Sequence, residues 1–345
     1  MNKNPFTLTF GVKPENYILR LSQSDKIISS FEQNTNNVIM ITGVRGTGKT
    51  ALLTYISEHF NSLKDWLVIE LISEADMLDQ LASKLYDSGL FHKIFDGKTF
   101  GFSFHGLSFS IKGDKPVTNV VSLIEILLEK IQKKKKVLIC VDEATNNSFM
   151  KPFVQTIQLL FRKKYHIGLL MTGLYQNIYD LQNNETLTFL YRAPKIDLEP
   201  LNIGAIAAEY KSVFKISEEE ALELASFTKG YAYAYQVLGY LLYESGKNYI
   251  DDSLLASFDQ YMQEYVYDKI WSEISTLDKR LLLGFSDETM QVDLLLKATG
   301  MEKNKFSVYR NRLIKRGIIS SSSYGQLSLK LPRFLNFLSI KRIGY

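Results

Sequence analysis

The chain contains 345 residues, 46% of them hydrophobic and 23% charged, with a formal net charge of +4 at pH 7. This composition is typical of a soluble globular protein, and the length allows two or three domains. The single cysteine, Cys140, excludes a disulfide framework, and no apolar run approaches the ~20 residues of a membrane span. Because the N-terminus also lacks the apolar core of a signal peptide, we expect a cytoplasmic protein with no membrane partner.

The glycine-rich segment from Gly43 to Thr50 is the strongest motif in the chain. It reads GVRGTGKT, and it lies between an apolar run at 38–41, predicted as a strand, and a run from Ala51 predicted as a helix. Glycines at this spacing let successive backbone N–H groups face one anion, and the helix N-terminus adds a favourable dipole. Lys49 has the reach for the β- and γ-phosphates, and the Thr50 hydroxyl is suited to Mg2+. We expect a phosphate-binding loop rather than a ligand-free turn, with nucleotide contacts from Gly43, Val44, Arg45, Gly46, Thr47, Gly48, Lys49, Thr50 and Ala51.

Two segments before the next buried strand have roles that the sequence leaves open. Residues 100–111 have a period of two, which indicates a β-hairpin that either packs on its own domain or touches DNA or a neighbouring subunit. The lysine run at 133–136 is either a solvated loop or a nucleic-acid patch. The cross-strand pairs predicted for the hairpin are Phe104 with Leu107, Phe102 with Phe109, and Phe100 with Ile111.

Two further predicted strands end in polar residues suited to nucleotide chemistry. A continuous apolar run at 137–141 ends in Asp142 and Glu143, and another at 167–171 ends in Thr172. Such runs are typical of central strands in a parallel sheet, where ligands bind at the carboxyl ends of the strands. Asp142 would then lie beside Mg2+ and Glu143 would orient the attacking water, although both acids could simply cap a loop. Thr172 would contact the γ-phosphate or its attacking water, or cap the segment that follows.

From residue 202 onward the chain is predicted to be mainly helical, and its end is basic. From residue 297 there are eleven basic residues and one acid, a net charge of +10, which suggests a polyanionic partner. Three short helices at 277–285, 292–299 and 304–316, followed by a polar turn and a strand at 326–331, predict a winged helix-turn-helix. Its third helix would present Lys305, Arg312 and Lys315 to a groove of double-stranded DNA. Winged helices also dock proteins, so a protein contact is the alternative for this domain.

Together these motifs resemble those of an AAA+ ATPase. More closely, the chain is similar to the bacterial and archaeal-type ATPases allied to the origin-recognition initiators and the STAND NTPases. The similarity includes the opening Asn4-Pro5-Phe6, the segment Leu190-Tyr191-Arg192 and the ending at 309–317. The resemblance implies that Asp142 and Glu143 form the Walker B pair and that Thr172 occupies sensor 1.

The resemblance also assigns roles that the residues alone do not suggest. It makes Arg192 an arginine finger or sensor arginine, with a structural ion pair as the alternative, and it places the backbone of Tyr17 and Ile18 beside the adenine. The sequence departs from the family in two places. The usual Gly-Arg-acid opening is reduced to Leu19-Arg20-Leu21, and the lid helix starting at Gly230-Tyr231-Ala232 offers no sensor arginine. Both departures favour slow hydrolysis over a fast motor.

The predicted fold is α/β, with a P-loop NTPase (AAA+) parallel-sheet domain at 1–200, an all-α lid at 201–270 and a winged-helix domain at 271–345. The predicted function is an ATPase switch that binds ATP or ADP with Mg2+ and repositions the basic winged helix on double-stranded DNA. The alternative is a STAND-like regulatory module in which nucleotide is structural and the winged helix docks protein. Self-association or another protein partner is open in both cases, since an arginine finger acts in trans.

Overall fold

The computed structural model describes residues 3–9, 11, 13–88, 102–104, 107–109, 119–321 and 323–343. Contacts along the chain divide it into two compact units. The sheet unit comprises residues 21–42 and 53–196, and the helical unit comprises residues 1–20, 43–52 and 197–345. By its contacts the glycine-rich loop therefore belongs to the helical unit, although the strand that precedes it belongs to the sheet unit.

A five-stranded sheet in the order β2-β5-β6-β1-β7 forms the centre of the sheet unit. β2 pairs with β5, β5 with β6, and β6 with β1, all in parallel. β1 and β6 are buried at every position, because their continuous apolar runs face helices on both sides. Parallel pairing therefore brings the carboxyl ends of β5, β6 and β1 to one edge of the sheet. The strands are β1 (Val38–Thr42), β2 (Trp66–Ile72), β5 (Lys136–Asp142), β6 (Ile167–Gly173) and β7 (Lys195–Asp197).

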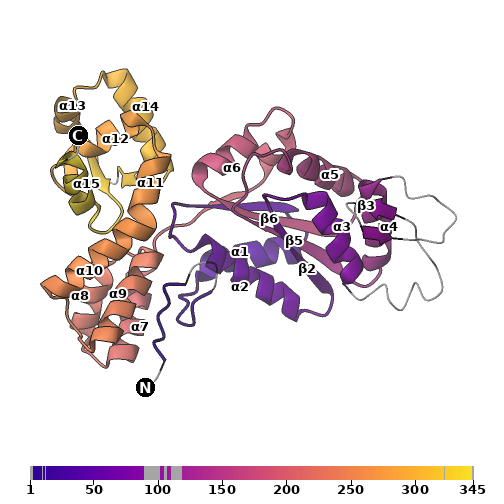
Figure 1. Ribbon diagram of the computed structural model, residues 1–345, viewed down its shortest axis with the longest axis horizontal. Coiled ribbons are helices and arrows are strands. Elements are labelled where there is room, and N and C mark those ends of the chain that lie inside the picture. Colours follow the sequence, from indigo (N-terminus) through magenta and orange to yellow (C-terminus); the bar gives the residue numbers. More distant parts are fainter. Residues whose placement is uncertain are drawn as a thin grey trace. The chain divides into compact units, whose positions relative to one another are not determined.

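Helices cover both faces of this sheet (Figure 1). On one face, the apolar stripes of α3, α4, α5 and α6 join the strands in a single core. On the other face lie α1 and α2, where the rings of Phe31 and Phe60 meet edge to face with centroids 6.1 Å apart. The elements are α1 (Leu21–Glu32), α2 (Lys49–Ser62), α3 (Met77–Asp87), α4 (Val120–Ile131), α5 (Met150–Arg162), α6 (Tyr175–Gln182) and the 3-10 helix η1 (Thr188–Arg192).

The first helices of the helical unit share one apolar core with the N-terminal segment. A capping box begins α8: the Ser217 hydroxyl accepts from the Glu220 N–H at 3.2 Å, and the Glu220 carboxylate accepts from the Ser217 N–H at 2.8 Å. Phe6 reaches this core from the N-terminal segment and stacks on Phe214, with ring centroids 5.8 Å apart. The elements are α7 (Ile203–Phe214), α8 (Glu218–Phe227), α9 (Ala232–Ser245), α10 (Asp252–Met262), the π-helical turn η2 (Gln263–Tyr267) and α11 (Asp268–Glu273).

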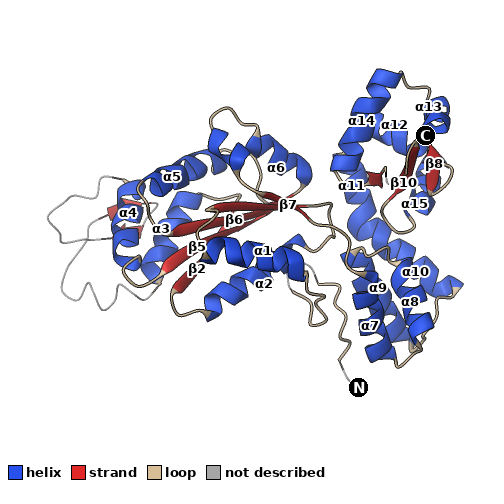
Figure 2. Ribbon diagram, turned by 180° about the vertical axis from the view of Figure 1, so that it is seen from behind, coloured by secondary structure: helices blue, strands red, loops and turns tan. Residues whose placement is uncertain are grey.

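The C-terminal elements combine short helices with a small antiparallel sheet in the order β8-β10-β9 (Figure 2). The three helices and the strand expected from the sequence are all present. β8 and β9 complete the sheet, and α15 follows it; neither β8 nor α15 was predicted. The elements are α12 (Thr276–Leu283), β8 (Thr289–Gln291), α13 (Val292–Thr299), α14 (Lys303–Lys315), β9 (Ile319–Ser320), β10 (Gln326–Leu329) and α15 (Phe334–Ile343).

The hairpin predicted within residues 100–111 is present as β3 (Phe102–Phe104) and β4 (Leu107–Phe109). Its antiparallel register pairs Phe102 with Phe109 and Phe104 with Leu107, as predicted. The third predicted pair, Phe100 with Ile111, lies outside the described residues.

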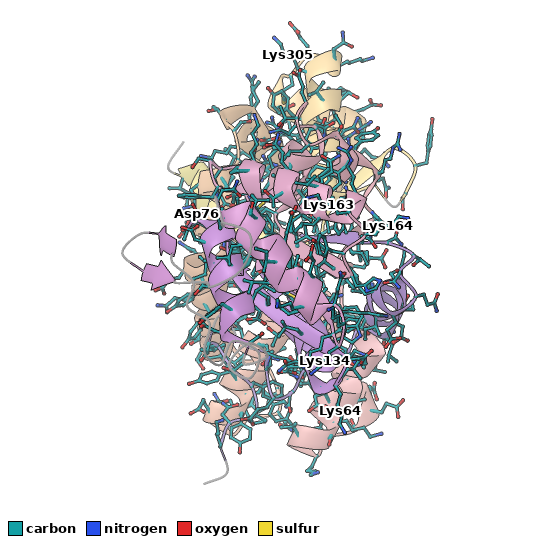
Figure 3. The ribbon with its side chains drawn as sticks, turned by 90° about the vertical axis from the view of Figure 1, so that its right-hand side faces the viewer. Lys64, Asp76, Lys134, Lys163, Lys164 and Lys305 are labelled. Atoms are coloured by element: carbon teal, nitrogen blue, oxygen red, sulfur yellow. The ribbon has the colours of Figure 1, made fainter. Side chains whose placement is uncertain are left out.

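Lysines gather on the loops that lead into β2, β5 and β6, at the amino edge of the sheet (Figure 3). Two lysines of the run at 133–136 contact Trp66: Lys135 Nζ donates to the Trp66 carbonyl at 3.2 Å, and Lys136 Nζ lies 5.3 Å from the centroid of the Trp66 ring. Exposed lysines in these loops are Lys64, Lys133, Lys134, Lys163 and Lys164. Over the described ranges, no helix has both the length and the apolar character needed to span a membrane.

Candidate nucleotide-binding site

The loop from Gly43 to Gly48 joins the end of β1 to the first turn of α2. Gly46 and Gly48 have φ angles of +79° and +89°, which glycine adopts freely and other residues adopt only with strain. Left-handed residues alternating with ordinary ones turn successive N–H groups toward one side and make an anion-binding nest. Lys49 opens α2, and its Nζ donates to the Gly43 and Val44 carbonyls, each at 3.1 Å. The loop therefore has the backbone shape that its sequence predicts.

Three consecutive carbonyls of this loop accept hydrogen bonds from residues outside it. All of the donors and acceptors lie in the helical unit. The pairs are the Tyr231 hydroxyl with the Arg45 carbonyl, the Tyr233 N–H with the Gly46 carbonyl at 3.0 Å, and the Arg20 guanidinium with the Thr47 carbonyl at 2.8 Å. Sequence patterns assigned no role to Arg20 or Tyr231, because a contact made to a main-chain carbonyl leaves no residue-type signal at the acceptor.

Asp142, Glu143 and Thr172 meet at the carboxyl edge of the sheet unit. The Thr172 hydroxyl donates to Asp142 Oδ1, and the Glu143 N–H donates to the same oxygen at 3.0 Å. Thr172 is completely buried, Asp142 is half-buried and Glu143 is exposed. Glu143 has a φ of +49°, a left-handed conformation that costs about 1–3 kcal/mol for such a residue. Its carbonyl accepts from the Ser73 hydroxyl at 3.1 Å, which helps to hold the turn.

The remaining residues proposed for the nucleotide lie apart from these two groups in the sequence. Tyr17 and Ile18 are half-buried in the helical unit, where Ile18 packs on the core. Arg192 ends η1 in the sheet unit and is exposed. It forms no ion pair with any residue that the structure describes, so the structural ion pair considered for it is not found there.

The three basic residues predicted to contact DNA differ in their surroundings on α14. Lys305 and Lys315 are exposed, and Lys305 Nζ lies 3.4 Å from the Glu302 carboxylate. The Arg312 guanidinium instead turns inward to Asp278, with Nε 2.9 Å from Oδ1 and a terminal nitrogen 2.5 Å from Oδ2. The Asp278 side chain is completely buried, so this pairing is part of the packing between α12 and α14.

The chain is similar to solved structures over almost its whole length. The Walker-type ATPase of Pyrococcus abyssi is 15% identical and gives a TM-score of 0.66, with 97% of this chain and 99% of that chain covered. The ORC2 protein of Aeropyrum pernix, solved as ADPNP–ADP complexes, is 12% identical and gives a TM-score of 0.58, with 96% and 98% covered. The chain has the AAA+ fold of the ORC proteins.

This AAA+ fold confirms the α/β fold class predicted from the sequence, including the helical C-terminal part. At identities of 12% and 15% the similarity is one of fold, and the chemistry has to be argued from the residues themselves. A family described as a domain of unknown function (DUF8462) matches residues 264–338, from η2 into α15. No curated protein matches the chain.

Proposed function

We propose that the chain binds ATP with Mg2+, hydrolyses it and acts as a nucleotide-controlled switch. The glycine-rich loop carries the proposal: a nest of backbone amides is followed by Lys49 at the first turn of a helix, in a chain with the AAA+ fold. The loop leaves the sheet at the end of β1. β1 lies beside β6 and β6 beside β5. Asp142 is the last residue of β5, Glu143 follows it, and Thr172 lies near the end of β6, so all three are at the carboxyl edge of the sheet.

The proposed phosphate and metal contacts follow from the donor set. Lys49 neutralises phosphate charge, and the amides of the residues from Gly43 to Ala51 bind phosphate oxygens. The Thr50 hydroxyl and the Asp142 carboxylate are oxygen ligands of the kind that Mg2+ takes, usually one or two from the protein and the rest from phosphate and water. Bound there, Mg2+ would offset the negative charge of the β- and γ-phosphates. The backbone at Tyr17 and Ile18 is assigned to the adenine.

The hydrolytic roles are assigned to the edge of the sheet and to one exposed arginine. Glu143 orients the attacking water, and its left-handed backbone supports this role, because strain of this kind is characteristic of functional turns. Thr172 orients Asp142 through its hydroxyl. It lies one residue before the end of β6 and pairs in register with Ile41 of β1. Arg192 is assigned to the γ-phosphate as a sensor or, from a neighbouring copy, as a finger; its exposure is compatible with both.

Calorimetric titration with ATP and Mg2+ tests this site. Lys49→Ala should raise the Kd for ATP at least tenfold, whereas Glu143→Gln should bind ATP with nearly native affinity but lose hydrolysis. Lys64→Ala, a change at an exposed lysine of the sheet unit, serves as the matched control and should alter neither quantity. An unchanged Kd for ATP in Lys49→Ala would contradict the proposal.

The switch part of the proposal is supported by contacts between the loop and the C-terminal elements of the helical unit. Arg45, in the loop, pairs with Glu273 at the end of α11 at 3.0 Å. The Glu273 carbonyl in turn accepts from the Arg316 guanidinium at 3.3 Å, just after α14. A change of loop conformation on phosphate binding would therefore alter the contacts that Arg45 makes with the end of α11 and, through Glu273, with the end of α14. A nucleotide switch needs such a difference in contacts between its two states.

We assign the C-terminal elements to a winged helix that binds double-stranded DNA. Three helices and a three-stranded antiparallel sheet have the element order of that fold, and α14 occupies the place of a recognition helix. The exposed stripe of α14 carries Lys305, Asn311 and Lys315. Several other cations of the +10 terminus are paired inside the unit, including Arg333 with Asp259 and Lys341 with Asp268, so the stripe rather than the total charge supports the assignment.

DNA affinity measured against salt concentration tests this assignment. Phosphate contacts predict a steep fall of affinity as salt rises, and Lys305→Ala and Lys315→Ala should each reduce the slope by about one. Lys64→Ala, in the sheet unit, is again the control and should leave the slope unchanged. Arg312→Ala is a poor probe here because it breaks the internal pair with Asp278.

Protein docking is the second candidate for the same surface. It is favoured by exposed apolar side chains: Val308 is 61% exposed in the middle of the α14 stripe, and Leu294 on α13 is 51% exposed. Tyr324, in the turn between β9 and β10, is fully exposed as well. DNA binding that is absent at low salt would favour a regulatory module in which this surface meets a protein and the nucleotide is structural.

A further inference from the structure

Three hydrogen bonds that reach the glycine-rich loop from outside end on main-chain carbonyls, those of Arg45, Gly46 and Thr47, whereas the Arg45 side chain pairs separately with Glu273. In a trans peptide, the carbonyl of one residue and the N–H of the next point in opposite directions. Holding the carbonyls of Arg45, Gly46 and Thr47 on one side therefore turns the amides of Gly46, Thr47 and Gly48 toward the other side. Among the described residues, the amides of Gly46 and Gly48 meet no acceptor, and that of Thr47 has only a long contact of 3.4 Å to the Val44 carbonyl. The loop thus offers unused donors on the side opposite its holders.

We propose that Tyr231 and Arg20 are positioning residues for phosphate binding. They hold the carbonyls of the loop so that its amides converge on an anion before that anion arrives. The inference rests on the proposed nucleotide function of the loop and adds two residues to it. Tyr231 immediately precedes α9 and Tyr233 lies in its first turn, so the phosphate affinity depends on the start of α9 staying docked against the loop.

Tyr231 fits this role by its burial and by the space that Gly46 leaves for it. It is 5% exposed, and burial raises the pKa of its hydroxyl, so the hydroxyl remains protonated and able to donate. A Cβ at Gly46 would collide with this hydroxyl and would lie 3.2 Å from the Tyr233 Cβ. The Tyr233 N–H belongs to the first turn of α9, where amides lack partners inside the helix, and here it is satisfied by the Gly46 carbonyl.

Arg20 fits because its buried guanidinium donates hydrogen bonds to two main-chain carbonyls. It is 7% exposed, and burial lowers the pKa of its guanidinium. The guanidinium donates to the Thr47 carbonyl at 2.8 Å and, from its other terminal nitrogen, to the Glu199 carbonyl. Burying a charge is costly unless its hydrogen bonds are made, so a residue needed only to fill this space would be apolar. The two-pronged donor ties the loop to the segment that leads into the lid.

Tyr231→Phe in the full chain is the decisive variant, because it removes the donor and keeps the ring. We expect its Kd for ATP with Mg2+ to rise about fivefold to tenfold, and its Kd for inorganic tripolyphosphate to rise by the same factor. Affinity for adenosine should not change, since the hydroxyl acts only on the phosphate loop. Tyr267→Phe is the matched control: Tyr267 is 2% exposed, and its hydroxyl also donates to a main-chain carbonyl, that of Pro332, far from the loop in sequence.

Arg20→Lys provides a second, independent variant, which keeps the charge but cannot bridge two carbonyls with one planar group. It should weaken tripolyphosphate binding about tenfold while the protein stays folded by circular dichroism. Tripolyphosphate affinities within twofold of the unmodified chain for both variants would overturn the inference, as would an equal loss in Tyr267→Phe. If the unmodified chain binds neither ATP nor tripolyphosphate, the proposed function itself fails, and that result is distinct from a failure of the two variants alone.

Discussion

Arg312→Ala should destabilise the C-terminal part of the helical unit, because it leaves the Asp278 carboxylate buried without its cationic partner. The Asp278 side chain has no exposed surface, whereas that of Arg312 is 30% exposed. Removing one partner of a fully buried ion pair costs about 3–5 kcal/mol. Ser275 keeps two hydrogen bonds to the Asp278 carboxylate, from its N–H at 3.0 Å and its hydroxyl at 2.9 Å. These bonds and the partial exposure of Arg312 reduce the expected loss to about 2–3 kcal/mol.

Urea unfolding followed by tryptophan fluorescence measures this loss. The chain has two tryptophans, Trp66 in the sheet unit and Trp271 in α11. In a Trp66→Phe background the emission reports on Trp271, which is 8% exposed and packs edge to face on Phe337. Lys315→Ala is the matched control, since Lys315 is exposed on the same helix and its removal should change the free energy of unfolding by less than about 0.5 kcal/mol.

A loss in Arg312→Ala no larger than that in Lys315→Ala would refute the reasoning, because it would mean that Asp278 needs no counter-charge. The double variant with Asp278→Ala sharpens the test: if the two side chains stabilise each other, the losses should fall short of additivity by about 1–3 kcal/mol. A stable Arg312→Ala protein with weakened DNA binding would instead return Arg312 to the DNA-contacting surface.

Gly46→Ala should abolish ATP binding in a protein that still folds, because its φ of +79° is strained for alanine and the new Cβ would collide with the Tyr231 hydroxyl; calorimetry beside circular dichroism checks this, and retained affinity would contradict it. Phe6→Ala should lower the free energy of unfolding of the helical unit by about 3–5 kcal/mol, because its ring is 2% exposed and stacks on Phe214. In the same urea assay, a loss below about 1 kcal/mol would mean that the N-terminal segment does not stabilise that core. Cys140 should resist thiol reagents at pH 8 until the sheet unit unfolds, because it is 1% exposed and burial raises the pKa of its thiol. Because the pKa of the Cys140 thiol is higher in the folded than in the unfolded chain, its ionisation lowers the stability of the fold only above the pKa of an exposed thiol, about 8.5. Rapid labelling of Cys140 in the native protein near neutral pH would contradict its burial.

The central strands and the glycine-rich loop were predictable because their signals are local. β5 and β6 are apolar runs too long and too continuous for a half-exposed element, and the polar residues at their ends then fall on one edge by parallel pairing. The loop is equally local, since its glycines specify the backbone and the lysine follows at a fixed distance. The hairpin register was predictable for the same reason: once the turn is set, Phe102 must face Phe109.

Contacts between distant segments were not predictable. A helical wheel places Arg312 on the polar face of α14 with Lys305 and Lys315, but it contains no information about Asp278, 34 residues earlier. The three-residue strand β8 also escaped prediction, because so short an edge strand has no period to detect and forms only where β10 offers it a partner. Burial on one side of an otherwise polar helix is decided by the element it packs on, and that element lies outside any sequence window.

The glycine-rich loop joins these two kinds of information. Its shape is encoded between Gly43 and Thr50, yet its carbonyls and its arginine are held by Arg20, Tyr231 and Glu273, which come from three other parts of the chain. If the loop binds phosphate as proposed, any ligand that favours this docked arrangement tightens phosphate binding, and phosphate favours that arrangement by the same factor, because coupling free energies are reciprocal. A DNA duplex bound on α14 is such a ligand only if it distinguishes the docked from the undocked loop. A duplex on α14 has a physical means to distinguish them, because Arg316, just after α14, donates to the Glu273 carbonyl and the Glu273 carboxylate pairs with Arg45 of the loop.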